Sequence, residues 1–267
     1  VFDAVAVSNQ PADITICSNS NASFTVAATG TVVGYQWQLS TDGGASYNNI
    51  GGETNATLQL TAVTSTQTGY RYRCVITGGC SNSTSNAAIL TVQNAPAFTA
   101  QPTSNNICQG SSNTFSVAST GDVLSYQWQL STDGGTNFTN INGADATSYA
   151  VTNATVAQNN YRYRCVVSGA CTPAITSTVA VLNVTAPVVV NTQPANAALC
   201  GSGNTGFSIN ATGTGISYQW QLSTNGGIVF NDVNSATAAT LNVNATGTNF
   251  DNYKYRVIVR NGVCTDV

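Results

Sequence analysis

The sequence contains no histidine and no methionine, and charged residues make up only 6% of its 267 residues. Without histidine it lacks the commonest general acid and base at neutral pH. The ten carboxylates are scattered, with no pair placed alike along the chain. We therefore expect no enzyme and no cofactor.

Positive charge is also scarce, and long apolar runs are missing. The formal net charge is −3, which excludes the basic surface that nucleic acid or anionic lipid would need. No stretch approaches the roughly 18 apolar residues of a membrane span. We expect neither a nucleic-acid partner nor direct membrane insertion. Because a primary translation product begins with Met, we interpret the chain as a processed or excerpted piece of a longer protein.

The residues that are abundant form strands and turns. Thr, Asn, Ser, Ala, Val and Gly dominate, 42% of residues are hydrophobic, and the hydrophobic residues alternate with polar ones. This alternation favours folded β-structure over disorder. Strands are predicted at 23–30, 34–40, 56–63, 70–77 and 86–92, and the Asp-Gly of "TDGG" (41–44) predicts a hairpin turn.

A repeat organises the chain. "YQWQLSTDGG" at 35–44 recurs at 126–135 and, as "YQWQLSTNGG", at 218–227. Trp37, Trp128 and Trp220 are 91 and 92 residues apart. We predict three domains, at 1–93, 94–186 and 187–267, each a small β-sandwich of six or seven strands. The connections are short and contain proline, which favours a stiff rod.

The strand "YRYRCVITGGC" (70–80), with its second copy "YRYRCVVSGAC" (161–171), makes the pattern more specific. A Trp on the third strand, an L-x-L strand and a Tyr two residues before a Cys are typical of immunoglobulin-like domains. The form of this pattern in the present sequence resembles the Ig-like repeats of very large surface and secreted proteins of Bacteroidota-type bacteria, including gliding and adhesive filaments. The resemblance implies an all-β chain of tandem Ig-like sandwiches. The core residues that it implies are Trp37, Trp128, Trp220, Tyr72, Tyr163 and Tyr255.

The third copy ends early, since only "TDV" follows Cys264. We therefore expect the third sandwich to lack its last strand in this chain. Either the chain has been cut or another polypeptide supplies the strand.

Eight cysteines in such a chain indicate an oxidising, extracellular compartment. Zinc is disfavoured because paired C-x2-C spacings are absent. The third repeat has only two cysteines, with Val257 in place of Cys74 and Cys165, so we expect the remaining two types to pair. The predicted disulfides are Cys17–Cys80, Cys108–Cys171 and Cys200–Cys264. Cys74 and Cys165 would then be buried free thiols. A Cys17–Cys74 pairing is the alternative.

Six of the seven positive charges lie on the "YRYRC" strand and its copies. Period two places these charges on the outer face, beside the glutamines of the "YQWQ" strand. The resulting polar stripe consists of Gln36, Gln38, Arg71, Arg73, Gln127, Gln129, Arg162, Arg164, Gln219, Gln221, Lys254 and Arg256. One interpretation is a hydrogen-bonded ladder that keeps the sheet soluble. The other is a contact surface for a glycan or a neighbouring filament.

Calcium is disfavoured at Asp42 and Asp133, because the third copy has Asn225 and one carboxylate cannot complete a calcium site. The functional hypothesis is a mechanical and adhesive segment of a secreted surface protein, which binds copies of itself, other filament chains or a cell-surface ligand. One alternative is a carbohydrate-binding array that uses Tyr47, Phe138 and Phe230. Another is a passive spacer within a multi-domain enzyme.

Overall fold

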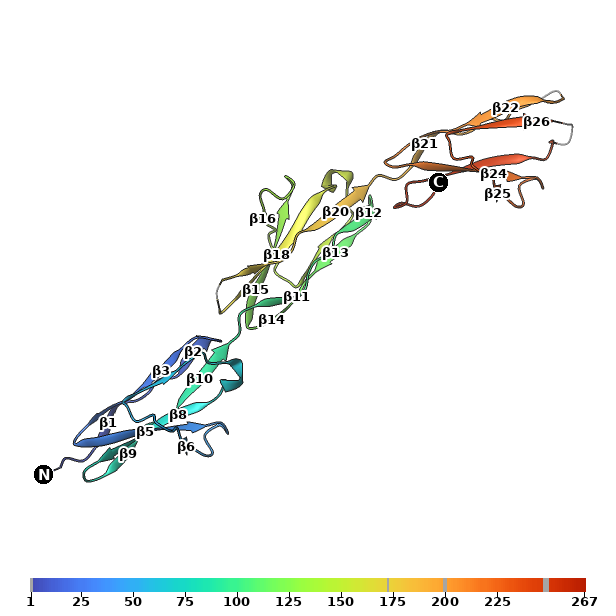
Figure 1. The fold of residues 1–267 in the computed structure, drawn as a ribbon. Coiled ribbons are helices and arrows are strands. Elements are labelled where there is room, and N and C mark those ends of the chain that lie inside the picture. The colour runs from blue at the N-terminus through green and yellow to red at the C-terminus, as the bar shows by residue number, and fades with distance from the viewer. Residues whose placement is uncertain (1, 172, 199–200, 247–249) are drawn as a thin grey trace. The chain divides into compact units, whose positions relative to one another are not determined.

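The computed structural model describes residues 2–171, 173–198, 201–246 and 250–267. The chain forms two units by its contacts. The first consists of residues 1–101, 117–127 and 165–177, and the second of residues 102–116, 128–164 and 178–267. Among the described residues, the regular structure consists of short strands in three repeats (Figure 1) and two single-turn 3₁₀ helices.

The first repeat, a two-layer sandwich, contains ten strands. They are β1 (Ala6–Asn9), β2 (Ile14–Cys17), β3 (Ala22–Thr25), β4 (Ala27–Thr29), β5 (Val32–Ser40), β6 (Asn48–Asn49), β7 (Thr57–Leu60), β8 (Arg71–Gly78), β9 (Asn82–Thr84) and β10 (Ala88–Gln93), with η1 (Ser65–Gln67) before β8. The larger sheet has the order β2-β10-β8-β5-β6, and β9 pairs with β8. Strands β3 and β7 pair in the facing layer, and β1 pairs with β4.

Strand β10 has a parallel neighbour on one side and an antiparallel neighbour on the other. Strand β10 runs parallel to β2, with Gln93 opposite Cys17. It runs antiparallel to β8, with Ala88 opposite Tyr72 and Ile89 opposite Arg71. Cys17 therefore lies where the chain leaves the repeat, beyond the first residue of β8.

The second repeat uses the same strand order. Its elements are β11 (Ala97–Ala100), β12 (Asn105–Cys108), β13 (Asn113–Ser116), β14 (Ala118–Thr120), β15 (Val123–Ser131), β16 (Thr139–Asn140), β17 (Ser148–Val151), η2 (Val156–Gln158), β18 (Tyr161–Gly169), β19 (Ile175–Thr176) and β20 (Ala180–Thr185). Its larger sheet is β12-β20-β18-β15-β16, and β13 pairs with β17.

Among its described residues, the third repeat has fewer strands. They are β21 (Val189–Thr192), β22 (Gly203–Ser208), β23 (Asn210–Thr212), β24 (Ser217–Ser223), β25 (Asn231–Asp232), β26 (Thr240–Ala245) and β27 (Lys254–Arg260). Strand β24 lies between β25 and β27, and β22 pairs with β26. Within the described part of the chain no strand corresponds to β10 or β20, in agreement with the expected loss of the last strand.

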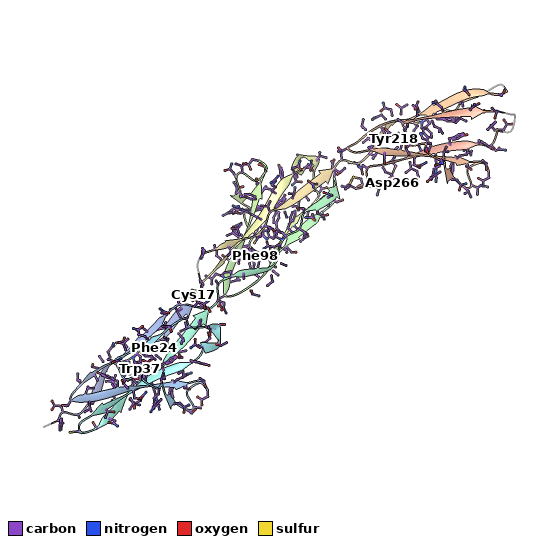
Figure 2. All side chains as sticks on the ribbon, in the orientation of Figure 1. Cys17, Phe24, Trp37, Phe98, Tyr218 and Asp266 are labelled. Atoms are coloured by element: carbon purple, nitrogen blue, oxygen red, sulfur yellow. A yellow bond between two sulfur atoms is a disulfide. The ribbon has the colours of Figure 1, made fainter. Side chains whose placement is uncertain are left out.

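Alternating side chains build the first core. On β8 the side chains of Tyr72, Cys74 and Ile76 are buried, whereas those between them are half-buried. Trp37 is 0% exposed, and its indole N–H donates to the Asn55 carbonyl at 2.9 Å. Phe24 stacks on Tyr72 with ring centroids 4.9 Å apart, and it lies near Trp37 between the two layers (Figure 2).

The predicted core residues of the other repeats divide into two groups. Trp128, Trp220 and Tyr163 are buried, and Phe115 stacks on Tyr163 with centroids 4.6 Å apart. Tyr255, predicted as a core residue, is only half-buried. It borders an open cavity of about 520 Å³. In the first repeat Leu90 of β10 is fully buried in the core, and the third repeat has no such strand among its described residues.

Candidate functional site

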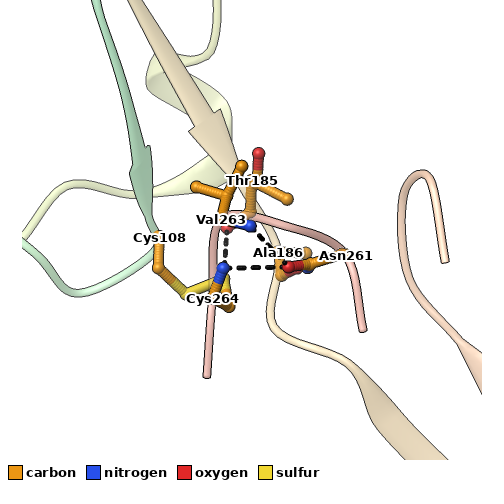
Figure 3. The surroundings of a disulfide bond; sticks show 6 residues. All are labelled: Cys108, Thr185, Ala186, Asn261, Val263 and Cys264. Atoms are coloured by element: carbon orange, nitrogen blue, oxygen red, sulfur yellow. Dashed lines mark hydrogen bonds between the residues drawn. A yellow bond between two sulfur atoms is a disulfide. The ribbon is translucent and has the colours of Figure 1, made fainter. Parts of the chain in front are cut away.

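The two joints between consecutive repeats are covalent. Cys17, at the end of β2, is bonded to Cys171, in the turn after β18 of the second repeat, with an S–S distance of 2.10 Å and a Cα–Cα distance of 5.7 Å. Cys108, at the end of β12, is bonded to Cys264 after β27, with a Cα–Cα distance of 5.0 Å (Figure 3). Each disulfide therefore ties one repeat to the next.

These bonds correct the predicted pairing within each repeat. Cys17 is beside Gln93, whose carbonyl accepts the Ser18 N–H at 2.8 Å, where β10 leaves the sandwich. Cys80 follows the last residue of β8. An eight-residue strand spans on the order of 26 Å, whereas disulfide-bonded Cα atoms lie about 4.4–6.8 Å apart. Cys17 and Cys80 are at opposite ends of the sheet, so Cys17 reaches the next repeat instead.

The other proposed pairings are wrong for the same reason. Cys108 and Cys171 each bond to a different repeat, and Cys264 bonds to Cys108. Cys200, the predicted partner of Cys264, lies outside the described residues. The alternative Cys17–Cys74 bond is also contradicted, because Cys74 is a buried free thiol.

Backbone hydrogen bonds surround the first disulfide. The Asn94 N–H, in the three-residue connection after β10, donates to the Asp122 carboxylate at 2.6 Å. The Asp122 N–H donates to the Asn94 carbonyl at 3.0 Å, and the Ala170 N–H donates to the Asp122 carbonyl at 3.3 Å. The connection is thus held to the turn before β15, and that turn is itself bonded to the one that carries Cys171.

Asn261 organises the second joint. Its side-chain carbonyl accepts the N–H groups of Val263 at 3.2 Å and Cys264 at 2.8 Å. Its amide donates to the Ala186 carbonyl, in the connection after β20, at 2.9 Å (Figure 3). Sequence reasoning missed both Asp122 and Asn261. Their polar side chains lie in turns next to the repeat connections, but the two residues do not occupy equivalent positions, so the repeat gave no signal for them.

Gly121 fits closely against the first connection. It has φ +92°, and a Cβ built on it would collide with the Ala95 carbonyl. We expect Gly121→Ala to destabilise the second repeat by about 2 kcal/mol or more, because the left-handed backbone alone costs an L-residue about 1–2 kcal/mol. Urea unfolding checks this. Gly134→Ala is the control, since Gly134 has φ +79° with nothing within 4 Å of the added Cβ. An equal loss in both variants would contradict a role for this contact.

The remaining described cysteines are free thiols in two environments. Cys74 and Cys165 are buried, as the sequence predicts, and burial raises the pKa of both thiols. Cys80, a predicted disulfide partner, is free and exposed.

We expect Cys74→Val to change the free energy of unfolding by less than about 1.5 kcal/mol, because Val has a similar volume and Val257 holds this position in the third repeat. Cys74 is paired with Trp37 on the neighbouring strand β5.

Iodoacetamide should label Cys80 in the native chain and leave Cys74 and Cys165 unlabelled, as mass spectrometry can show. Rapid native labelling of Cys74 would contradict this assignment.

The polar stripe forms one hydrogen-bonded network in each repeat. The Arg73 Nε donates to the Gln38 side-chain carbonyl at 2.8 Å, and the Gln38 amide donates to Asn49 at 2.9 Å. The corresponding distances are 2.7 and 2.8 Å for Arg164, Gln129 and Asn140. They are both 2.7 Å for Arg256, Gln221 and Asp232. This geometry is that of a cross-strand ladder.

Each ladder arginine also covers an aromatic ring. The Arg73 guanidinium carbon lies 3.8 Å from the centroid of Tyr47. The same distance is 3.9 Å for Arg164 over Phe138 and 4.2 Å for Arg256 over Phe230. A guanidinium over a ring contributes a cation–π attraction of about 0.5–1 kcal/mol at an exposed site. One face of each proposed sugar-binding ring is therefore occupied. The sequence feature that points to these rings is an aromatic residue ten positions after each repeat's Trp.

The other stripe residues contact backbone and loops. The amide of Gln36 donates to the Trp37 and Ile50 carbonyls at 2.9 and 2.8 Å, and that of Gln219 donates to the Trp220 and Val233 carbonyls at 2.9 and 3.0 Å. A Cβ at the loop glycines Gly44, Gly135 and Gly227 would meet the side chains of Arg71, Arg162 and Lys254, respectively. Gln127 occupies the position of Gln36 in the second repeat.

The "TDGG" segment belongs to a longer loop than a two-residue hairpin turn. Strand β5 pairs with β6 from Leu39 to Asn48, so residues 41–47 connect them. Asp42 accepts hydrogen bonds from the hydroxyl and the N–H of Ser46 and from the Ser40 hydroxyl, and these bonds hold its pKa well below the usual value. The carboxylate is thus used within the loop.

We expect Asp42→Asn to reduce the acid sensitivity of the first repeat. A carboxylate whose pKa is lowered by folding adds stability above its unfolded pKa of about 4, and this stability is lost as pH falls below that value. Asn225 makes equivalent bonds in the third repeat, accepting the Ser223 hydroxyl at 2.8 Å. Thermal melting at pH 5 and pH 2 should show a smaller loss for the variant than for the parent chain. An identical loss would contradict the assignment.

Among the described residues, no three His, Cys, Asp or Glu side chains gather where a metal ion could bind. No helix in that part of the chain is long and apolar enough to cross a membrane.

Comparison with known proteins agrees with the three-repeat organisation. The chain is similar in fold to the titin fragment I67–I69, with 16% identity, coverage of 98% of this chain and 95% of that one, and a TM-score of 0.59 for the E-to-A variant. It is similar to immunoglobulin domains 1–5 of Sidekick-1, with 14% identity, coverage of 100% and 58%, and a TM-score of 0.53. These likenesses show tandem immunoglobulin-like domains.

No curated protein matched the sequence. One family model matches it three times, at residues 7–94, 99–186 and 189–267. The chain therefore belongs to the family described as domain of unknown function (DUF8696), of which it contains three copies.

Proposed function

We propose that this chain is a structural and adhesive segment of a large extracellular surface protein of bacterial type, in which disulfides link consecutive Ig-like domains. The observation that carries the proposal is the pair of disulfides between repeats, Cys17–Cys171 and Cys108–Cys264. A bond within a domain stabilises that domain, whereas a bond between neighbours restricts their relative motion. The disulfides also favour an oxidising, extracellular compartment.

The division at residues 1–93, 94–186 and 187–267 is part of this proposal. Only three residues, Asn94–Pro96, separate β10 from β11, and three separate β20 from β21. Connections this short leave little slack between domains. Together with the disulfide at each joint, they support a stiff segment that transmits force and presents other domains for cell attachment or filament assembly.

The ladder supports a structural role for the polar stripe. Its arginines and glutamines satisfy one another and the adjacent loop. A carbohydrate-binding array receives less support, because an arginine covers one face of each candidate ring. Loss of glycan binding on mutating Tyr47, Phe138 or Phe230 would favour that alternative. A passive spacer in a multi-domain enzyme would need no stiff joints.

Single-molecule FRET can test the stiffening. Dyes on unnatural amino acids at the exposed positions Gln59 and Ser148 would report the distance between the first two repeats. We expect a narrow distance distribution in the oxidised chain and a broad one in the Cys17→Ser/Cys171→Ser double variant. Cys74→Val is the matched control, since it removes a thiol that is not at the joint. Equal distributions in the oxidised parent and the double variant would overturn the proposal.

A further inference from the structure

The buried thiol of Cys165 is six positions before Cys171, which forms the disulfide with Cys17. Cys165 lies in the middle of β18, is 0% exposed and takes part in neither joint. Burial also raises the pKa of its thiol, which disfavours the reactive thiolate in the folded repeat. The second repeat therefore contains a shielded nucleophile close in sequence to a bonded sulfur.

The intact strand keeps the two sulfurs in different surroundings. The Cys165 Sγ lies 3.7 Å from the carbonyl of the next residue on β18, Val166. The Cys171 Sγ lies beyond the end of the strand, 3.5 Å from the Gln93 carbonyl where the first repeat ends. From Cys165 to Gly169 the extended strand spans on the order of 13 Å. A reaction between the two cysteines therefore requires the C-terminal half of β18 to leave the sheet.

This half of β18 has short neighbours on one side. Strand β20 pairs with the first three residues of β18, Tyr161–Tyr163. Beyond them the two-residue strand β19 pairs with Val166 and Val167. The Cys165 N–H donates to the Ser177 hydroxyl, and the Ser177 N–H donates to the Cys165 carbonyl, both at 2.8 Å. Segments held by few bonds open locally before a whole domain unfolds, so opening at β19 exposes Cys165 beside the segment that leads to Cys171.

The second joint differs at the corresponding position. Cys264 occupies the place of Cys171, but Val257 holds the place of Cys165 on β27. To attack the other disulfide, Cys165 would have to reach Cys108, which is 57 positions away instead of six. Loop-closure entropy makes the longer loop roughly twentyfold less favourable. The two joints therefore provide an internal comparison, because one has a thiol nearby in sequence and the other has a valine.

We propose that Cys165 is a built-in exchange partner for the first joint, so that opening of β18 converts the Cys17–Cys171 bond into a Cys165–Cys171 bond and releases Cys17. The inference rests on the proposed function, in which disulfides link the repeats, and it adds a way to release one link. The first joint is thereby convertible, and the second joint is permanent.

The exchange needs no oxidant or reductant. Cys165 loses its proton to water, and the thiolate attacks the Cys171 sulfur. A new S–S bond forms as the bond to Cys17 breaks, and its electron pair stays on the Cys17 sulfur, which then takes up a proton. One thiol is consumed and one is formed, so the number of disulfides in the chain does not change.

The test uses the full oxidised chain with Cys74→Val, Cys80→Ser and Cys200→Ser, so that Cys165 is the thiol left outside the two joints. The chain is incubated at pH 8 with and without urea, alkylated at intervals, cleaved without reduction and analysed by mass spectrometry. We expect a Cys165–Cys171 linked peptide and alkylated Cys17 to form at least tenfold faster in urea than in native buffer. In the same samples the initial loss of the Cys108–Cys264 peptide should be at least tenfold slower than that of the Cys17–Cys171 peptide.

Cys165→Val in the same background is the matched control, since it gives the second repeat the residue of the third. We expect its Cys17–Cys171 bond to persist in urea. Iodoacetamide added together with the urea should protect the bond in the parent background as well, because it alkylates Cys165 as the thiol becomes exposed.

Three results would overturn the inference: loss of the Cys17–Cys171 bond in the Cys165→Val chain, equal loss at both joints, or persistence of the Cys17–Cys171 bond in urea when Cys165 is present. Persistence of the bond would leave the proposed function intact, because the FRET distribution of the oxidised chain tests that function separately. Equal FRET distributions in the parent and the Cys17→Ser/Cys171→Ser variant would reject the stiff segment without bearing on the exchange.

Discussion

Stretched from its two ends with both disulfides intact, the chain is expected to extend to only about a third of its full length. The covalent path runs from the N-terminus to Cys17 and crosses to Cys171. It then returns through the second repeat to Cys108 and crosses to Cys264. The path contains roughly 80 of the 267 residues, so its limit is about 300 Å instead of about 900 Å at about 3.5 Å per residue. Force spectroscopy with and without reducing agent measures this difference.

Single-cysteine variants distinguish this path from bonds within each repeat. Cys80→Ser should leave the oxidised limit at about 300 Å, whereas Cys171→Ser should raise it to about 400 Å because roughly 110 residues would then carry the force. If Cys17 were bonded to Cys80 instead, Cys80→Ser would raise the limit to about 500 Å. A length increase in Cys80→Ser would therefore contradict the joints.

Trp37→Ala is expected to destabilise the first repeat by about 3–5 kcal/mol, the usual cost of removing a fully buried aromatic side chain. The indole is 0% exposed, packs near Phe24 and donates a hydrogen bond to the Asn55 carbonyl, which would lose its partner. For a domain of this size the midpoint of thermal unfolding should fall by about 12 °C or more. Differential scanning calorimetry can follow the transition of this repeat.

Val33→Ala is the matched control for that experiment. Val33 is on the same strand, β5, and is 68% exposed, so its truncation should change stability by less than about 0.5 kcal/mol. A loss below about 1 kcal/mol for Trp37→Ala would show that the tryptophan does not anchor the core.

The all-β fold could be predicted from the sequence because apolar and polar residues alternate along each predicted strand, and this pattern occurs in all three repeats. The same alternation that buries Tyr72 and Cys74 leaves Arg73 on the outer face, where it meets Gln38. The ladder could be predicted because the alternation along each strand places the arginines and glutamines on the outer face of two neighbouring strands. Its aromatic cover, Tyr47 under Arg73, did not, because Tyr47 lies in the loop after the "TDGG" segment and its position depends on the loop conformation.

The disulfide pairing could not be predicted from the repeat alone. The substitution of Val257 for the middle cysteine indicated that the first and last cysteine types belong together. This comparison between repeats cannot distinguish a bond within a repeat from a bond to the next repeat. In both cases the first and last cysteines of a repeat are retained when the middle one is replaced. The parallel pairing of β10 with β2, which places Cys17 beside Gln93 at the exit of the domain, decides between them.

The burial of Tyr255 in the third repeat could not be predicted from its sequence position either. Tyr255 has the same sequence context as Tyr72, but its burial depends on a strand that follows it in the first repeat. Sequence similarity at one position therefore predicted the strand and its facing side, whereas the degree of burial depended on which neighbouring strands are present.

Disulfide mapping of the full oxidised chain is the most direct test of the bonds between repeats. The chain would be alkylated in denaturant, cleaved without reduction and analysed by mass spectrometry. We expect linked peptides that join Cys17 to Cys171 and Cys108 to Cys264, with alkylated Cys74 and Cys165. Peptides that join Cys17 to Cys80 and Cys108 to Cys171 would contradict it.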